Sequence, residues 1–359
     1  MRWAVLSLAG LPLLLLAIGF VSTLTHSHEL SRATLRLLRN VLLVEVILFL
    51  VLATVGAIYE GRSRARDQRL HPAPGKLIDM GGYRLHLYCT GEGSPTVVLD
   101  YGLSGSYLDW YFVQPEVARL TRVCSWDRSG YGWSDRSPNV QVPSSIAEQL
   151  HTLLAKAGEK PPYILVGHSL GAFDVRMYAH LYPEQVAGLV LVDGSHPDES
   201  LRFSWRDKLW LKLMELTAPF GLPRWRRWCT SGRQPMASIK GAFNCQSRVF
   251  RAHYDQWNVF PESAEEARKL GSLGDLPLVV VARDPNTNRD PHGPALNERE
   301  QRWHEHQKKM AQLSSNSTFI VAEGSGHGVP TQRPDVVVEA IRKVLEQHKS
   351  SEKPSIPAR

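Results

Sequence analysis

Two long apolar runs open the chain, before any regular alternation begins. Residues 3–24 are almost continuously hydrophobic, and residues 41–58 form a second run that only Glu45 interrupts. Each run is about as long as a bilayer core requires, so the pattern predicts two transmembrane helices joined by a short loop. A signal peptide is the alternative for the first run, but no clear small-residue cleavage site follows it. Glu45 suits a contact with the partner helix, an interfacial position or a functional role.

After a proline-containing linker at residues 71–75, short apolar strands alternate with amphipathic helices. A hairpin pair at 77–80 and 83–89 is expected first. Further strands are expected at 96–100, 122–126, from 163 onward, 186–193, 276–282 and 318–322. Helices are expected around 146–154, at 172–181, through Trp303 to Met310, and at 335–348. This alternation predicts a mostly parallel sheet covered by helices on both faces.

The alternation stops between Gly194 and about Gly274. This stretch is rich in tryptophan and phenylalanine, and it predicts a helical, irregular insertion between two sheet strands. The chain therefore divides into a membrane region, a split α/β core, the insertion, and a polar tail that is predicted to be disordered. The boundaries are 1–70 for the membrane region, 71–195 and 275–348 for the core, 196–274 for the insertion, and 349–359 for the tail.

Basic residues gather at both ends of the second apolar run. A formal net charge of +7 would suit a nucleic-acid-binding protein, but the arginines lie beside the hydrophobic span, as membrane-interface anchors do. They are Arg32, Arg36 and Arg39 before that run, and Arg62, Arg64, Arg66 and Arg69 after it. Zinc-finger spacing and a P-loop are absent from the sequence, so no nucleic-acid partner is expected. A hydrophobic content of 43% with 21% charged residues excludes a disordered chain.

The segment Gly167-His-Ser-Leu-Gly171 is the strongest candidate for chemistry. It follows the apolar segment that begins at Tyr163 and precedes an alanine-containing helical pattern. Strand, sharp turn and helix with a serine at the apex predict a nucleophile elbow, in which Ser169 projects beyond the sheet and the glycines permit close packing. A glycine-rich turn with an ordinary serine is the alternative.

An elbow serine needs a base and a carboxylate. His327, in the glycine-rich turn Gly324-Ser-Gly-His-Gly328 after the last strand, is the predicted base, because the order serine, acid, histidine suits this arrangement. Asp284, just beyond the strand at 276–282, is the preferred acid. Asp193, which ends the strand after the elbow helix, is the alternative acid. Either aspartate could instead be a helix cap or a turn residue.

An oxyanion that forms at the attacked carbonyl needs hydrogen-bond donors already in place. The backbone N–H of Leu170, directly after the serine, is one candidate donor. The backbone N–H of Leu103, in the loop after the strand at 96–100, is the other. Both roles belong to the main chain, so the side chains say little about them.

From about Leu77 to Gln347 the chain resembles the α/β-hydrolase superfamily. The resemblance rests on the elbow, on Asp127-Arg-Ser-Gly-Tyr-Gly-Trp-Ser-Asp135, on Leu-Val-Leu-Val-Asp193 and on Gly-Ser-Gly-His327. It implies an α/β-hydrolase fold with a mostly parallel eight-stranded sheet and a helical lid formed by the insertion. The 127–135 motif is expected to be structural, with Trp133 near the pocket mouth. Relatives commonly have His-Gly where this chain has Tyr101-Gly102. In haloalkane dehalogenases and epoxide hydrolases of this branch the nucleophile is an aspartate, so Ser169 argues against both activities.

Two signals disagree about the side of the membrane. Two spans place the N-terminus and the core on the same side of the membrane. More arginines lie on that side than in the loop between the spans, so the positive-inside tendency favours a cytoplasmic core. In the sheet order that the resemblance implies, the strands of Cys89 and Cys124 are neighbours, and Cys229 and Cys245 both lie in the lid. Two disulfides would indicate an extracytoplasmic compartment, whereas free buried thiols would not. The side is left open.

These features predict a membrane-anchored serine hydrolase of carboxylic esters with Ser169, His327 and Asp284 as its triad. Neither a metal nor an organic cofactor is expected. The expected partners are a small-molecule ester, lipophilic because the lid is aromatic, and the lipid bilayer. Acyl transfer, amide hydrolysis or carbon–carbon bond hydrolysis on the same triad is one alternative. A catalytically silent binding or scaffold module is another.

Overall fold

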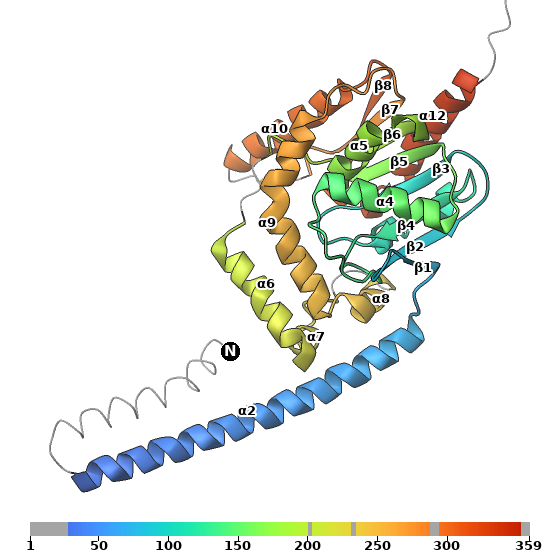
Figure 1. Ribbon diagram of the computed structural model, residues 1–359. Coiled ribbons are helices and arrows are strands. Elements are labelled where there is room, and N and C mark those ends of the chain that lie inside the picture. The colour runs from blue at the N-terminus through green and yellow to red at the C-terminus, as the bar shows by residue number, and fades with distance from the viewer. Residues whose placement is uncertain (1–27, 200–202, 231–234, 288–293, 353–359) are drawn as a thin grey trace, which may run out of the picture.

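A central eight-stranded sheet organises the protein, in the order β1-β2-β4-β3-β5-β6-β7-β8 (Figure 1). The computed structural model describes residues 28–199, 203–230, 235–287 and 294–352. β2 is antiparallel to both β1 and β4, and every other neighbouring pair is parallel. The strands are β1 Lys76–Asp79, β2 Arg84–Thr90, β3 Thr96–Asp100, β4 Val123–Asp127, β5 Tyr163–His168, β6 Val186–Val192, β7 Leu278–Arg283 and β8 Ser317–Ala322.

Helices cover both faces of the sheet. Buried residues of α4, α5 and α10 pack on one face, and those of α3 and α12 pack on the other. The helices of the core are α3 Gln114–Val117, α4 Pro143–Ala157, α5 Gly171–Leu181, α10 Pro294–Ala311, α11 Val329–Gln332 and α12 Pro334–Glu352, with short 3₁₀ turns η1 Tyr107–Trp110 and η2 Pro183–Gln185. Within β5, Tyr163 and Leu165 face the first layer while Ile164 and Val166 face the second. A strand that is apolar on both faces is typical of a parallel sheet buried between helices.

The insertion forms a helical lid beside the carboxyl ends of the strands. Its elements are α6 Trp205–Thr217, η3 Ala218–Phe220, α7 Leu222–Trp225, α8 Met236–Phe243 and α9 Ser247–Lys269. Phe260 and Ala264 of α9 pack against Leu170 and Phe173, which lie at the start of α5. The lid therefore covers the turn that carries Ser169.

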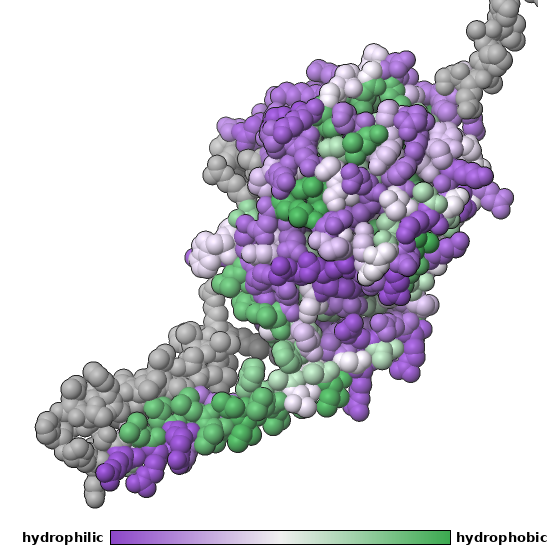
Figure 2. Space-filling view, in the orientation of Figure 1, coloured by the Kyte–Doolittle hydropathy of each residue, from purple (hydrophilic) through white to green (hydrophobic). Residues whose placement is uncertain are grey.

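Among the described residues, helix α2 His28–Leu70 precedes the core and projects beyond it (Figure 1). Its residues 32–70 are long and apolar enough to cross a membrane, and no other helix of the described residues meets that test. Large apolar side chains from Leu42 to Tyr59 are exposed, and Figure 2 shows them as a continuous hydrophobic length. The predicted span at 41–58 lies within α2. The other predicted span, at 3–24, lies outside the described residues.

The predicted fold class is confirmed, and each of the eight expected strands is present within two residues of its expected bounds. Two elements are longer than expected. α2 continues through its arginine-rich end to Leu70. Arginine and alanine favour helix, and no proline occurs between His28 and Pro72 to end it. α12 continues to Glu352, so the start of the predicted disordered tail is helical. Ser350 Oγ donates to Glu346 O at 2.9 Å. After Pro334, at the start of α12, the next proline is Pro354, so no proline interrupts the helix before Glu352.

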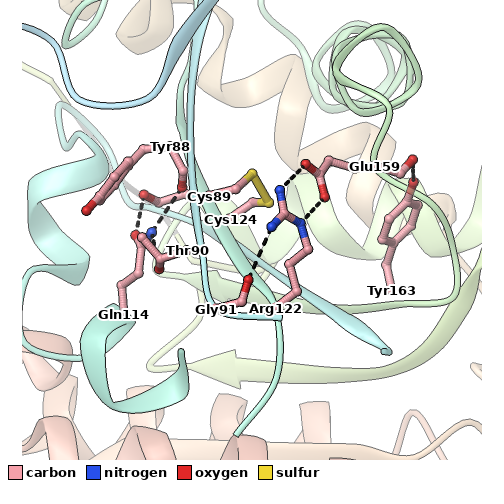
Figure 3. The surroundings of a disulfide bond; sticks show 10 residues. Tyr88, Cys89, Thr90, Gly91, Gln114, Arg122, Cys124, Glu159 and Tyr163 are labelled. Atoms are coloured by element: carbon pink, nitrogen blue, oxygen red, sulfur yellow. Dashed lines mark hydrogen bonds and ion pairs between the residues drawn. A yellow bond between two sulfur atoms is a disulfide. The ribbon is translucent and has the colours of Figure 1, made fainter. Parts of the chain in front are cut away.

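All four cysteines form disulfides. Cys89 and Cys124 are directly opposite each other on β2 and β4, with 4.0 Å between their Cα atoms. Cys229 and Cys245 join two segments of the lid. Figure 3 shows Arg122 beside the first bond, where its guanidinium donates to both carboxylate oxygens of Glu159 at 2.5 and 2.6 Å and to Gly91 O at 3.2 Å. The hydrogen bonds of Arg122 therefore reinforce the sheet beside this disulfide.

Replacing Cys89 and Cys124 together by alanine is expected to lower the free energy of unfolding by about 4 kcal/mol, because the bond closes a separation of 35 residues. The pair Cys229 and Cys245, separated by 16 residues, is expected to contribute about 3 kcal/mol. Urea unfolding of both double variants measures the two losses. Thiol alkylation of the folded, non-reduced protein should modify no cysteine, and modification of all four would contradict both bonds.

Candidate active site

Ser169 lies at a sharp turn between β5 and α5. Its φ of +52° is in the left-handed region that residues with a side chain rarely adopt. The Ser169 N–H donates to Val192 O at 3.1 Å, and Ser169 O accepts from the N–H of Ala172 at 3.1 Å. The predicted strand–turn–helix arrangement is present, and it holds the serine in a strained conformation at the sheet edge.

Three glycines make room for this turn. A Cβ at Gly102 would lie 2.8 Å from Ser169 Cβ, one at Gly167 would lie 2.6 Å from Gly171 O, and one at Gly171 would lie 2.8 Å from Tyr101 O. These separations are shorter than van der Waals contact. Any larger residue at these positions would displace the turn, so the glycines of the motif are required by packing.

His327 joins Ser169 to a buried carboxylate. Its Nε2 lies 2.9 Å from Ser169 Oγ, and its Nδ1 lies 2.6 Å from Asp193 Oδ2. The loop after β8 carries His327, whose side chain is 44% exposed, whereas Asp193 is fully buried. The three groups form a continuous hydrogen-bonded relay in the chain order serine, aspartate, histidine. Such a relay can remove the serine proton and stabilise the imidazolium that results.

Four donors hold the Asp193 carboxylate in place. Besides His327, the backbone N–H and the Nη1 of Arg283 donate at 3.1 and 3.0 Å, and Trp303 Nε1 donates at 2.7 Å. Burial by itself raises the pKa of Asp193, but the hydrogen bond and charge of His327, together with Arg283 and Trp303, lower that pKa below its usual value. The carboxylate is therefore ionised at neutral pH and fixed in orientation.

Asp284, the acid preferred from the sequence, does not contact His327. Its Oδ1 accepts from the N–H of Asn286 at 2.8 Å, and its Oδ2 accepts from the N–H of Gly324 at 3.0 Å. The preference for Asp284 is corrected in favour of the alternative, Asp193. Both aspartates follow parallel strands at the same sheet edge, but β6 adjoins the nucleophile strand β5 whereas β7 is one strand farther away. Asp284 instead supports the loop in which His327 lies.

The two predicted oxyanion donors lie close to the serine. Leu170 precedes the first residue of α5, and its side chain shares an apolar cluster with Leu103 and Phe173. Neither the N–H of Leu170 nor that of Leu103 donates to another protein atom among the described residues. Both N–H groups are thus available to a ligand, and their role as an oxyanion hole stays a prediction.

Arg128 is a buried charge near the site that the sequence reasoning missed. Its Nη1 donates to Asp174 Oδ2 at 2.5 Å, and its Nη2 donates to Gly102 O at 2.6 Å. Its guanidinium lies 4.4 Å from the centre of the Tyr101 ring, and its backbone N–H donates to Tyr101 Oη at 2.6 Å. Arg128 therefore joins the Tyr101–Leu103 loop to α5. Asp174, an acidic residue in the first turn of the helix that follows Ser169, was the available signal.

His168 also supports the site. Burial first, and then the neighbouring His327, lower the pKa of His168 to about 4, so its ring is neutral at physiological pH. Its Nε2 lies 2.8 Å from the carbonyl oxygen of His327, to which a neutral ring protonated at Nε2 donates. His168, the residue before Ser169, thus holds the backbone of His327 in place.

The Asp127–Asp135 motif has the expected structural role. The Asp127 carboxylate accepts from the N–H of Tyr107 at 2.8 Å and from that of Trp133 at 2.9 Å, and it lies 2.7 Å from His86 Nδ1. A side chain at Gly132 would overlap this carboxylate. The motif therefore closes a tight loop at the end of β4 and supplies no group to the serine.

A candidate metal cluster lies outside the relay. Among the described residues outside the disulfides, His196, Asp198 and His306 have donor atoms within 4.8 Å of one another. The two histidine rings stack at 4.3 Å and 15°, an arrangement in which their nitrogen lone pairs run side by side rather than toward one point. Asp198 is half exposed. We assign no metal to this cluster.

Comparison with known proteins agrees with the observed architecture. A family model described as alpha/beta hydrolase fold matches residues 95–220. The chain is similar to the uncharacterized protein YbdG of Bacillus subtilis, with 26% identity over 188 residues that cover 51% of this chain and 55% of that protein. The chain spans about half the length of the first curated relatives that it matches.

Solved structures of two different kinds of enzyme share the fold. A thermophilic esterase from Thermogutta terrifontis aligns with a TM-score of 0.54 and 21% identity, covering 76% of this chain and 98% of its own. The epoxide hydrolase CorEH aligns with a TM-score of 0.53 and 19% identity, covering 76% of this chain and 97% of its own. At these identities the likeness shows the fold alone.

Replacing Asp193 by asparagine is expected to slow modification of Ser169 by a fluorophosphonate about 10³–10⁴-fold, because the histidine loses its ionised partner and its tautomer. Asp284→Asn is the matched control, and it should retain most of the wild-type rate since the Asp284 carboxylate accepts from the N–H groups of Asn286 and Gly324 and not from His327. Labelling rates of both variants at neutral pH decide the matter. An equal or larger loss in Asp284→Asn would contradict the assignment of Asp193.

Replacing Arg128 by leucine is expected to lower the free energy of unfolding by about 3–5 kcal/mol, because Asp174 is left buried without its cation. Arg136→Leu is the control, since the ion pair of Arg136 with Asp255 is largely exposed and is expected to contribute about 0–1 kcal/mol. Urea unfolding measures both values. Equal losses in the two variants would show that the buried ion pair contributes no more to the free energy of unfolding than the exposed one.

Proposed function

The chain belongs to the α/β-hydrolase superfamily, and we propose that it is a membrane-anchored serine hydrolase that cleaves carboxylic esters through an acyl-enzyme. The relay from Ser169 Oγ through His327 to Asp193 carries this proposal, since it is the arrangement that a serine nucleophile needs. A catalytically silent module is not favoured, because such a module needs neither the strained serine nor an ionised, four-fold hydrogen-bonded aspartate behind the histidine.

The proposed reaction proceeds in two halves. Ser169 Oγ attacks the acyl carbon as its proton passes to His327 Nε2, and the N–H groups of Leu170 and Leu103 donate to the oxyanion. His327 then gives the proton to the leaving alkoxide, which departs as the alcohol and leaves the acyl group on Ser169. In the second half, water loses a proton to His327, attacks the acyl-enzyme and releases the acid, and the proton returns to Ser169.

The identity of residue 169 selects among the chemistries that this fold supports. Hydrolysis through a covalent alkyl-enzyme ester requires a carboxylate nucleophile, and a serine at this position cannot supply it. An activated serine instead attacks acyl carbon, so esters are favoured over epoxides and alkyl halides. Acyl transfer uses the same first half, and it is distinguished from hydrolysis by whether the product is the free acid or a new ester.

The membrane anchor and the substrate class rest on apolar surface. α2 is the helix that would cross the bilayer, and the lid beside the site is rich in tryptophan and leucine. Both features favour a lipophilic ester. The two disulfides support an oxidising compartment for the domain, against the arginine distribution, and we place the domain on the extracytoplasmic side.

A fluorophosphonate probe is expected to label the wild-type protein and to fail with Ser169→Ala, because only an activated serine reacts. Ser238→Ala, at an exposed position in the lid, is the matched control and should be labelled like the wild type. The folded wild type left unlabelled would refute the enzyme assignment. A series of p-nitrophenyl esters then tests the substrate class, and activity confined to the acetate would refute the lipophilic ester.

A further inference from the structure

An apolar stripe runs along the outer face of the lid. Its members are spaced by three or four residues on α6 and continue onto η3 and α7, which places them on one side. Their exposed fractions are between 44% and 70%, high for such large side chains. The stripe consists of Trp205, Leu209, Leu213, Leu216, Phe220 and Trp225.

The stripe is not the core-facing side of α6. Leu211 and Met214, on the opposite side of this helix, are buried against Phe250 of α9. α6 is therefore apolar on two sides, of which the fold uses one. A surface helix that leaves a row of tryptophan and leucine side chains in water forgoes about 25 cal/mol for each Å² of apolar area, so the row indicates an apolar partner.

The stripe adjoins the apolar length of α2. A Cβ at Gly56 would overlap the carbonyl of Phe220, and a Cβ at Gly221 would lie 2.8 Å from the Tyr59 ring, so the two backbones are in close contact. Figure 1 shows α7 beside α2, and in Figure 2 hydrophobic residues of the lid gather on the side nearest the hydrophobic length of α2. The two apolar surfaces are thus continuous.

A largely buried ion pair fixes the level at which lid and helix meet. Arg224 Nε lies 2.7 Å from Glu60 Oε2, and Arg224 Nη1 pairs with Asp67. Glu60 directly follows Tyr59, where the row of exposed large apolar side chains that begins at Leu42 ends. A bilayer that surrounds the apolar part of α2 therefore ends near Tyr59, at the height of the stripe.

Arginines accompany the exposed tryptophans. The Arg206 guanidinium lies 5.6 Å from the Trp205 ring, and that of Arg226 lies 5.6 Å from the Trp225 ring and 5.2 Å from the Trp228 ring. Tryptophan and arginine are the residues that occupy the headgroup region, where one end of a side chain is apolar and the other is hydrated. This composition matches a lipid surface better than a protein core.

We propose that the lid stripe is embedded in the leaflet around α2, so that the lid forms a second membrane contact and receives ester substrates from the lipid phase. The occupant is phospholipid, at the depth of the headgroups and upper acyl chains. This inference rests on the proposed function in two respects, that α2 spans the bilayer and that the substrate is a lipophilic ester.

Depth-dependent quenching tests the proposal on the full chain reconstituted in phosphatidylcholine vesicles. The fluorophore NBD is attached to Leu213→Cys or to Trp225→Cys, and Val140→Cys is the matched control, an exposed apolar position on the core. Lipids brominated near the top of the acyl chain are expected to quench the first two probes and to leave the third unchanged. Equal behaviour of all three probes would overturn the proposal.

Two further measurements distinguish lipid contact from self-association of the lid, and lipid contact from hydrolase activity. Quenching of the lid probes by a second copy that carries a dark acceptor, without quenching by bromolipid, would assign the stripe to self-association and overturn the lipid contact. Fluorophosphonate labelling on the same vesicles reports the proposed function independently. Labelled protein with unquenched probes refutes the stripe's lipid contact alone, whereas quenched probes on unlabelled protein refute only the hydrolase.

The double substitution Leu209→Asp with Leu213→Asp extends the test to turnover. Hydrolysis of a long-chain ester dissolved in the vesicles is expected to fall about tenfold relative to Val140→Asp, which corresponds to about 1.4 kcal/mol. An unchanged rate for a folded variant would contradict delivery of substrate through the stripe. Should this variant fail to fold, the quenching result on the single cysteine variants decides the question.

Discussion

The close approach of three backbone segments around Ser169 is the constraint on which the site depends. The end of β5, the start of α5 and the loop after β3 come so near one another that Gly102, Gly167 and Gly171 have no room for a Cβ atom. Close packing forces Ser169 into a left-handed conformation, and the surrounding core compensates for that strain. The N–H groups of Leu103 and Leu170, the predicted oxyanion donors, belong to two of these segments and donate to no protein atom among the described residues. The position of Ser169 thus follows from a single feature of backbone packing.

Two buried charges keep this packing in register. Arg128 joins the loop after β3 to α5, and Asp193 joins β7, α10 and the loop of His327 to the end of β6. Removing a charge from water is costly. Several hydrogen bonds compensate this cost for Arg128, and several others compensate it for Asp193. A group held by several partners has little freedom to reorient, which is the property that a reacting site requires of its supporting residues.

The sequence predicted those features of the fold and the site that are determined by residues close together along the chain. The strands, the elbow with Ser169 and the turn with His327 follow from local patterns, and the structure places these two residues in contact. The choice between Asp193 and Asp284 could not be made locally, because both follow strands at one edge and only the three-dimensional order of the strands separates them. Contacts between distant segments, such as Arg224 with Glu60, leave no pattern in a single sequence. Ser350 shows a smaller limit, since composition suggested disorder where local helix propensity prevails.

The pairing of α2 with the lid has a consequence for kinetics. α2 is one unbroken helix, and Arg224 holds the lid to it at Glu60 and Asp67, so the domain cannot swivel freely about its anchor. If α2 crosses a bilayer and the substrate is the proposed lipophilic ester, the domain and that ester would meet by diffusion in two dimensions. The rate would then follow the mole fraction of ester in the membrane, and adding inert lipid would slow turnover although the total amount of ester in the sample stays the same.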